Sequence, residues 1–169
     1  MSAALAILDT NVWLDWLAFD DPRAAPIASA HASGAVAIIA CPRARAELVE
    51  VAGREALGRQ VAAAQSRRGR VTLAPGSALQ GTVVRRFDAL VTLVPCAPRA
   101  PLGCTDPDDQ HLVDLAVAHR ARWLFTRDRA VLALARRARA RFGVQIAQPE
   151  ALALAGAGAA PTIPADGTP

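Results

Sequence analysis

Short apolar segments that alternate with longer amphipathic segments constrain the fold of this chain more than any other feature. The expected strands are residues 5–8, 35–40, 93–94, 123–126 and 144–146. Between them, apolar residues recur at helical spacing, as Leu112, Leu115 and Ala116 do. Alternating strands and helices are typical of a parallel sheet that helices cover on both faces. The sequence therefore predicts a three-layer α/β/α fold around a mostly parallel sheet of about five short strands.

The amphipathic segments predict where the helices lie. One helix begins near Thr10, another follows residue 106, and the rest cover residues 23–33, 42–54, 56–66, 77–91, 130–141 and 150–154. A chain of 169 residues suits one domain with one core. We expect that domain to span residues 1–155. Residues 156–169, rich in Gly, Ala and Pro, are expected to form a loose tail.

The composition excludes several classes of protein. Hydrophobic residues make up 53% of the chain and charged residues 20%, which is typical of a folded globular protein and not of a disordered one. No uncharged apolar stretch is long enough for a membrane span, and the first residues lack a secretion signal, so we expect a cytoplasmic protein without a membrane partner. Three cysteines without CxxC spacing support neither a disulfide framework nor a zinc ribbon.

The basic residues and histidines carry only weak functional signals. All 19 basic residues are arginine and they face 15 acids, which gives a net charge of +4. Such a small excess is a mild indication of an anionic partner. The histidines, His31, His111 and His119, are scattered singly, and we expect structural or solvent roles for them.

The positions of the acids are more informative. Asp9 directly follows the first expected strand, Asp128 follows the fourth, and residues 106–109 hold three acids at the start of a helix. In parallel sheets, sites form outside the carboxyl ends of the strands. Carboxylates that meet there raise each other's pKa unless a cation neutralises them. Oxygen ligands without a cysteine or a histidine pair favour Mg²⁺ or Mn²⁺ over zinc.

Structural roles are a real alternative for each acid. Aspartate is a preferred N-cap, and a negative charge in the first turn of a helix is stabilised by about 0.3–1 kcal/mol, so each aspartate could simply start a helix. Glu47 has Arg43 four residues before it, which is equally consistent with a surface ion pair. It is the coincidence of several acids at strand ends that favours a metal site.

Two segments resemble PIN-domain ribonucleases. The first is Leu8-Asp9-Thr10-Asn11, in which a strand ends in an aspartate, and the second runs from the acids of residues 106–109 through Ala116 to Thr126-Arg127-Asp128. Ala46-Glu47-Leu48 matches the helical glutamate of the family. The resemblance covers residues 5–150 and is nearest to bacterial PIN proteins described as toxin components of toxin–antitoxin systems.

The resemblance implies a set of site residues. The catalytic acids would be Asp9, Glu47, Asp109 and Asp128. The metal ligands would be Asp9, Asp109, Asp128 and Asp106. Residues that orient these carboxylates by hydrogen bonds would be Thr10, Asn11 and Thr126. Two assignments stay open: Glu50 lies one helical turn from Glu47, and Asp108 competes with its neighbours for the third position.

The resemblance also implies a function. It indicates Mg²⁺- or Mn²⁺-dependent hydrolysis of phosphodiester bonds in single-stranded RNA, with a cognate antitoxin protein and a homodimer as expected partners. Arginine binds phosphate bidentately and stacks on bases, so the candidate RNA ligands are the arginines near the acids: Arg43, Arg45, Arg127 and Arg129. A non-catalytic PIN-like module that binds RNA or protein is the alternative. Haloacid-dehalogenase-like and receiver-like folds are disfavoured because the chain has no lysine.

Overall fold

A parallel sheet forms the centre of the computed structural model, which describes residues 3–68 and 77–156. Within these residues the sheet has five strands in the order β3-β2-β1-β4-β5, and every pair is parallel. The strands are β1 (Ala4–Leu8), β2 (Val36–Ala40), β3 (Val91–Leu93), β4 (Trp123–Phe125) and β5 (Gln145–Ala147). The expected sheet is therefore confirmed, and it is wholly rather than mostly parallel.

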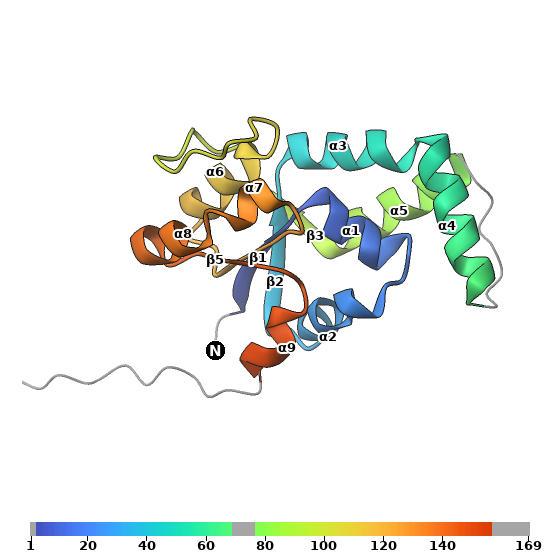
Figure 1. Ribbon diagram of the computed structural model, residues 1–169, viewed down its shortest axis with the longest axis horizontal. Helices are drawn as coiled ribbons and strands as arrows, with labels where there is room; N and C mark the ends of the chain where they lie inside the picture. Colours follow the sequence, from blue (N-terminus) through green and yellow to red (C-terminus); the bar gives the residue numbers. More distant parts are fainter. Residues whose placement is uncertain (1–2, 69–76, 157–169) are drawn as a thin grey trace, which may run out of the picture.

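Helices cover both faces of this sheet. They are α1 (Thr10–Leu17), the 3-10 helix η1 (Pro22–Ala24), α2 (Ala25–Ala32), α3 (Pro42–Ala52), α4 (Glu55–Arg67), α5 (Ser77–Leu90), α6 (Gln110–Ala118), α7 (Arg129–Leu132), α8 (Ala135–Phe142) and α9 (Ala151–Gly156). Figure 1 shows α1, α3, α4 and α5 on one side of the strands and α6, α7 and α8 on the other. No described helix is long and apolar enough to cross a membrane.

Several boundaries differ from those expected; the helix predicted over residues 23–33, for example, is the 3-10 helix η1 followed by α2. The helix predicted over residues 130–141 is two helices, because Leu134 donates to Val131 three residues back and interrupts the α-helical ladder. Strand β3 begins at Val91, which pairs with Ile38 instead of ending α5. The predicted tail lies outside the described residues except for position 156, where α9 ends.

The order of the strands creates a crevice at one edge of the sheet. The chain adds β2 and β3 on one side of β1 and then crosses to place β4 and β5 on the other. Strands β1 and β4 are paired in register, with Leu8 opposite Phe125. The backbone N–H of Asp9 donates to the carbonyl of Phe125 over 2.9 Å, so the ladder continues one residue past β1. Such a reversal of strand order is where parallel sheets form their sites.

Aromatic side chains from separate helices form part of the core beside β1 and β2. Trp13 on α1 and Phe87 on α5 are both at most 1% exposed, and their rings meet edge to face with 4.7 Å between centroids. This contact joins a helix that follows β1 to one that precedes β3. The carboxyl edge of the sheet is thus supported by helices packed from distant parts of the chain.

We expect Phe87→Ala to lower the free energy of unfolding by about 3–5 kcal/mol, because it leaves a cavity against Trp13. Urea denaturation followed by circular dichroism measures this loss. Leu93→Ala, at a side chain that is 47% exposed, is the control and should cost less than about 1 kcal/mol. Equal losses in the two variants would contradict the described packing.

Candidate active site

Asp9 is the most buried carboxylate at the carboxyl edge of the sheet. Its side chain is 3% exposed, and its Oδ2 atom accepts a hydrogen bond of 2.6 Å from the Thr126 hydroxyl. Burial raises the pKa of Asp9, the charges of Glu47 and Asp128 raise it further, and the Thr126 hydrogen bond opposes both effects. Asp9 occupies the N-cap position of α1, but its side chain makes no capping hydrogen bond. The backbone of Asn11, in the first turn of α1, nevertheless acts on the Asp9 carboxylate and lowers its pKa, so both α1 and Thr126 influence this side chain.

Thr126 links two of the predicted acids. It is fully buried, donates its hydroxyl hydrogen to Asp9, and accepts a 2.9 Å hydrogen bond from the backbone N–H of Asp128. One hydroxyl thus connects the ends of β1 and β4. The arrangement sets the direction of the Asp9 carboxylate, which is what a residue that orients a metal ligand would do.

Asp128 caps a helix and also lies near the other predicted acids. Its Oδ1 atom accepts hydrogen bonds from the backbone N–H groups of Ala130 and Val131, at 2.6 and 3.2 Å, and so caps α7. The charge of Asp128 nevertheless acts on both Asp9 and Asp109 and raises their pKa values. The cap uses Oδ1 only, which leaves Oδ2 for a ligand.

Burial and the crowding of carboxylates strongly raise the pKa of Asp109. Burial raises its pKa, and four neighbouring carboxylates raise it further, to about 7. These neighbours are Asp9, Asp128, Asp106 and Glu47. Asp109 stands at the N-cap position of α6 without a capping hydrogen bond. The structure therefore brings together the four predicted catalytic acids and Asp106.

The structure separates the candidates that the sequence could not. Glu50 is exposed and forms a 2.9 Å ion pair with Arg54, whereas Glu47 acts on Asp9 and Asp109. The ion pair with Arg43, which was the alternative for Glu47, is absent among the described residues. Arg43 instead lies 3.6 Å from Asp108, whose side chain is 93% exposed. Glu47 and Asp109 are thus the members of their pairs that face the cluster.

The two other predicted orienting residues differ from Thr126. Thr10 is buried in the first turn of α1, and Asn11 beside it is exposed. Neither side chain hydrogen-bonds to a carboxylate within the described residues. Their orienting roles stay predictions.

The chemistry of the cluster fits a hard divalent cation, although the acids are not closed around one. Among residues 3–68 and 77–156, no three His, Cys, Asp or Glu side chains already form an arrangement that holds a metal ion. The donors are carboxylate oxygens, which suit Mg²⁺ and Mn²⁺, and their mutual repulsion is what a cation relieves. Side-chain rotation would have to draw the oxygens together. The residues fit the ion in their chemistry, and hydrogen bonds already orient the carboxylates of Asp9 and Asp128.

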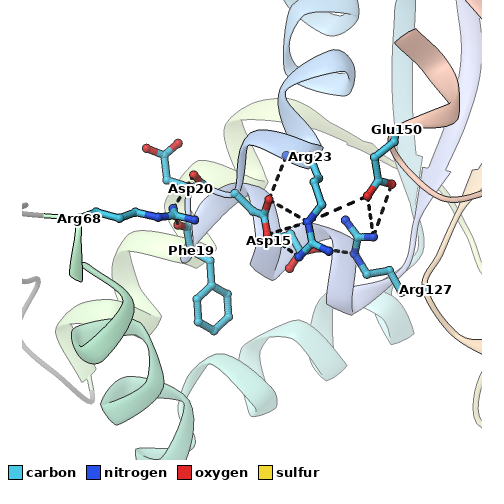
Figure 2. A network of polar contacts seen from close by, with 8 residues as sticks. Asp15, Phe19, Asp20, Arg23, Arg68, Arg127 and Glu150 are labelled. Atoms are coloured by element: carbon cyan, nitrogen blue, oxygen red, sulfur yellow. Dashed lines mark hydrogen bonds and ion pairs between the residues drawn. The ribbon is translucent and has the colours of Figure 1, made fainter. Parts of the chain in front are cut away.

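The four predicted RNA-binding arginines differ in their partners. Arg127 is tied between Asp15, at 2.6 Å, and Glu150, at 3.0 Å, in a network that also reaches Arg23 (Figure 2). Arg45 makes two 2.7 Å hydrogen bonds to Asp88. Arg43 contacts Asp108, and Arg129 is exposed with no ion pair among the described residues. Arg129 and Arg43 are therefore the arginines most available to a phosphate.

Sequence reasoning missed the buried polar residues of α6 that hold the preceding loop. The side chain of Gln110 accepts from the Cys104 N–H at 2.7 Å and donates to Asp114 at 2.6 Å. Asp114 also accepts from the Ala100 N–H at 2.8 Å. Gln110 and Asp114 lie one helical turn apart, and this spacing could have predicted the hydrogen bond between their side chains. These bonds anchor the segment that leads into Asp109.

The raised pKa of Asp109 predicts a pH-dependent stability. An unfolded aspartate ionises at about pH 3.9, while folded Asp109 retains its proton to about pH 7, so the fold loses this contribution as the pH rises between these values. In EDTA, Asp109→Asn should therefore be more stable than the wild type above about pH 7 and equal to it at about pH 3.5. Urea unfolding across this pH range measures the difference.

Asp88→Asn is the matched control, because its effect on stability should depend on pH in the opposite direction. Arg45 lowers the pKa of Asp88, so its stabilising contribution is present above about pH 4 and is lost as the pH falls. This variant should be less stable than the wild type at neutral pH. A pH-independent effect of Asp109→Asn would contradict the described crowding of the carboxylates.

Comparisons with known proteins bear on this site. A family model described as the PIN domain matches residues 6–130, which include all four acids. No curated protein and no solved structure matches the chain. PIN domains are generally nucleases, and they typically use divalent metal ions. The chain belongs to the PIN-domain family.

Proposed function

We propose that this protein is a metal-dependent endoribonuclease that hydrolyses phosphodiester bonds in single-stranded RNA. One observation carries the proposal: the charges of Glu47 and Asp128 raise the pKa values of both Asp9 and Asp109 at the carboxyl edge of the sheet, although the four acids come from distant parts of the chain. Carboxylates held this close in a partly buried site are destabilised without a cation. A bound divalent cation would relieve this repulsion.

The acids have different proposed roles in this reaction. Asp9, held by Thr126, is the central ligand, and Asp109, Asp128 and Asp106 complete the set. A bound Mg²⁺ or Mn²⁺ would supply a water of lowered pKa and would stabilise charge on the phosphate. Glu47 has two possible roles, as a further metal ligand or as the residue that orients the attacking water. Attack by water on phosphorus is expected to leave a 5′-phosphate and a 3′-hydroxyl.

Arginines around the cluster support a polyanionic substrate. Arg129 follows Asp128 directly and is exposed, and Arg43 lies beside the loop of Asp108. Guanidinium groups bind phosphate bidentately and stack on unpaired bases, so they suit single-stranded RNA. Arg45 and Arg127 would contribute only by exchanging their carboxylate partners for phosphate.

Asp9→Asn should lower the rate of RNA cleavage by about 100-fold or more, because it removes the charge of the central ligand. The measurement is gel analysis of a fluorescent single-stranded RNA with purified protein in Mg²⁺ or Mn²⁺. Chelation by EDTA should abolish cleavage in the wild type. Cleavage that survives both Asp9→Asn and EDTA would contradict the proposal.

Glu47→Gln and Glu50→Gln form a matched pair on α3. The two residues lie one helical turn apart, but only Glu47 acts on the cluster, while Glu50 pairs with Arg54. Glu47→Gln should therefore impair cleavage strongly, and Glu50→Gln should leave it within about twofold of the wild type. Equal effects would overturn the assignment of Glu47.

The biological role that we propose is that of a toxin in a toxin–antitoxin system. This role rests on the resemblance to bacterial PIN proteins, and so do the antitoxin partner and the homodimer. It also fits an enzyme of the cytoplasm, where RNA is available. Induction of the wild type in bacteria should arrest growth, and induction of Asp9→Asn should not. Normal growth with the wild type at equal protein levels would contradict the toxin role.

A non-catalytic PIN-like module is the second candidate. It is favoured by the finding that no three described His, Cys, Asp or Glu side chains are already arranged around a metal ion. Such a module would bind RNA or a protein without cleaving RNA. RNA binding by the wild type in Mg²⁺ or Mn²⁺ without any cleavage would favour it over the nuclease.

A further inference from the structure

His111, in the first turn of α6, is a buried residue that the site described so far does not use. Its side chain is 8% exposed. Its Nδ1 atom lies 2.7 Å from the carbonyl oxygen of Asp108. A carbonyl oxygen only accepts, so Nδ1 carries the hydrogen and donates it. In the neutral ring, this leaves the lone pair on Nε2.

The Nε2 atom of His111 has one acid of the cluster, Glu47, beside it and no hydrogen-bond partner among the described residues. It is buried and has no hydrogen bond to any described residue. Glu47 Oε2 lies 3.9 Å away, which is too long for a hydrogen bond. A lone pair and a carboxylate that face each other across this distance are both electron donors. The gap between them therefore suits a cation that accepts electron pairs from both sides.

The environment of His111 matches that of a metal-ligating histidine. Such histidines almost always donate the second ring N–H to a carboxylate, a backbone carbonyl or water, which fixes the tautomer and the orientation of the ring. Here the Asp108 carbonyl plays that part. Imidazole nitrogen is a ligand of first-row transition metals, whereas Mg²⁺ prefers oxygen alone.

We propose that the His111 Nε2 atom is a metal ligand beside Glu47, so that the carboxylate cluster binds Mn²⁺ in preference to Mg²⁺. This inference rests on the proposed function in one respect, that the cluster binds a divalent cation. It goes further by assigning a nitrogen ligand and a metal preference. The competing explanation is a protonated His111 that forms an ion pair with Glu47, which would leave no nitrogen for a metal.

The test compares wild type, His111→Asn and His119→Asn. In His111→Asn, the amide nitrogen of the substituted side chain can keep the hydrogen bond to the Asp108 carbonyl, but nothing replaces Nε2. His119, just after α6, is the control because it lies outside the cluster. Electron paramagnetic resonance measures free Mn²⁺ in a titration, and Mg²⁺ competition gives the affinity for Mg²⁺. Spin-echo modulation from ¹⁴N reports directly on a nitrogen bound to Mn²⁺.

We expect wild type and His119→Asn to bind Mn²⁺ more tightly than Mg²⁺ and to show ¹⁴N modulation. His111→Asn should lose about tenfold or more in Mn²⁺ affinity, lose the modulation, and change less than about twofold in Mg²⁺ affinity. Unchanged Mn²⁺ affinity, equal losses for both ions, or ¹⁴N modulation that persists in His111→Asn would overturn the inference. If His111→Asn does not fold, as judged by circular dichroism, His111→Gln replaces it; its amide oxygen can reach the Nε2 position, so the loss of ¹⁴N modulation is then the decisive result, and modulation that persists would overturn the inference.

These measurements contain no RNA, so they separate this inference from the nuclease proposal. His111-dependent Mn²⁺ binding in a protein that cleaves no RNA would uphold the nitrogen ligand and overturn the nuclease. Metal-dependent cleavage with a His111→Asn variant that binds Mn²⁺ like the wild type would do the reverse.

Discussion

Repulsion between carboxylates at one edge of a parallel sheet is the constraint on which the rest of this structure depends. Strands β1 and β4 are neighbours, so the acids that follow them meet, and α3 and α6 bring Glu47 and Asp109 to the same place. The cost is visible in Asp109, whose pKa is about 7. A fold selected for stability alone would not gather these charges, and their presence indicates a site where a cation is expected to bind.

The scaffold holds these acids by bonds that do not neutralise them. Thr126 fixes the Asp9 carboxylate and the backbone of Asp128. Arg127, two residues after the end of β4, joins Asp15 of α1 to Glu150, which directly precedes α9 (Figure 2). This network uses an arginine next to the cluster to fasten the surrounding elements. The negative charge of the cluster itself is left for a ligand.

Local patterns explain what the sequence could predict. The strands and Asp9 and Asp128 at their ends are visible because burial on both faces leaves short apolar runs that end at polar residues. The choice of Glu47 over Glu50 depends on how α3 is rotated against the sheet. The partners of Arg127, Asp15 and Glu150, are distant from it in sequence, so local patterns could not predict these ion pairs. His111 looked like an ordinary buried histidine because Glu47, which it faces, is 64 residues away.

A metal site formed by the acids at the carboxyl edge of the sheet can be tested directly in crystals. The most direct measurement is an anomalous difference map from crystals of the wild type soaked in Mn²⁺. We expect a peak that is bonded to the Asp9 carboxylate and flanked by Asp109 and Asp128, and no peak there in Asp9→Asn crystals. A well-ordered edge of the sheet without Mn²⁺, or Mn²⁺ bound only elsewhere, would contradict it.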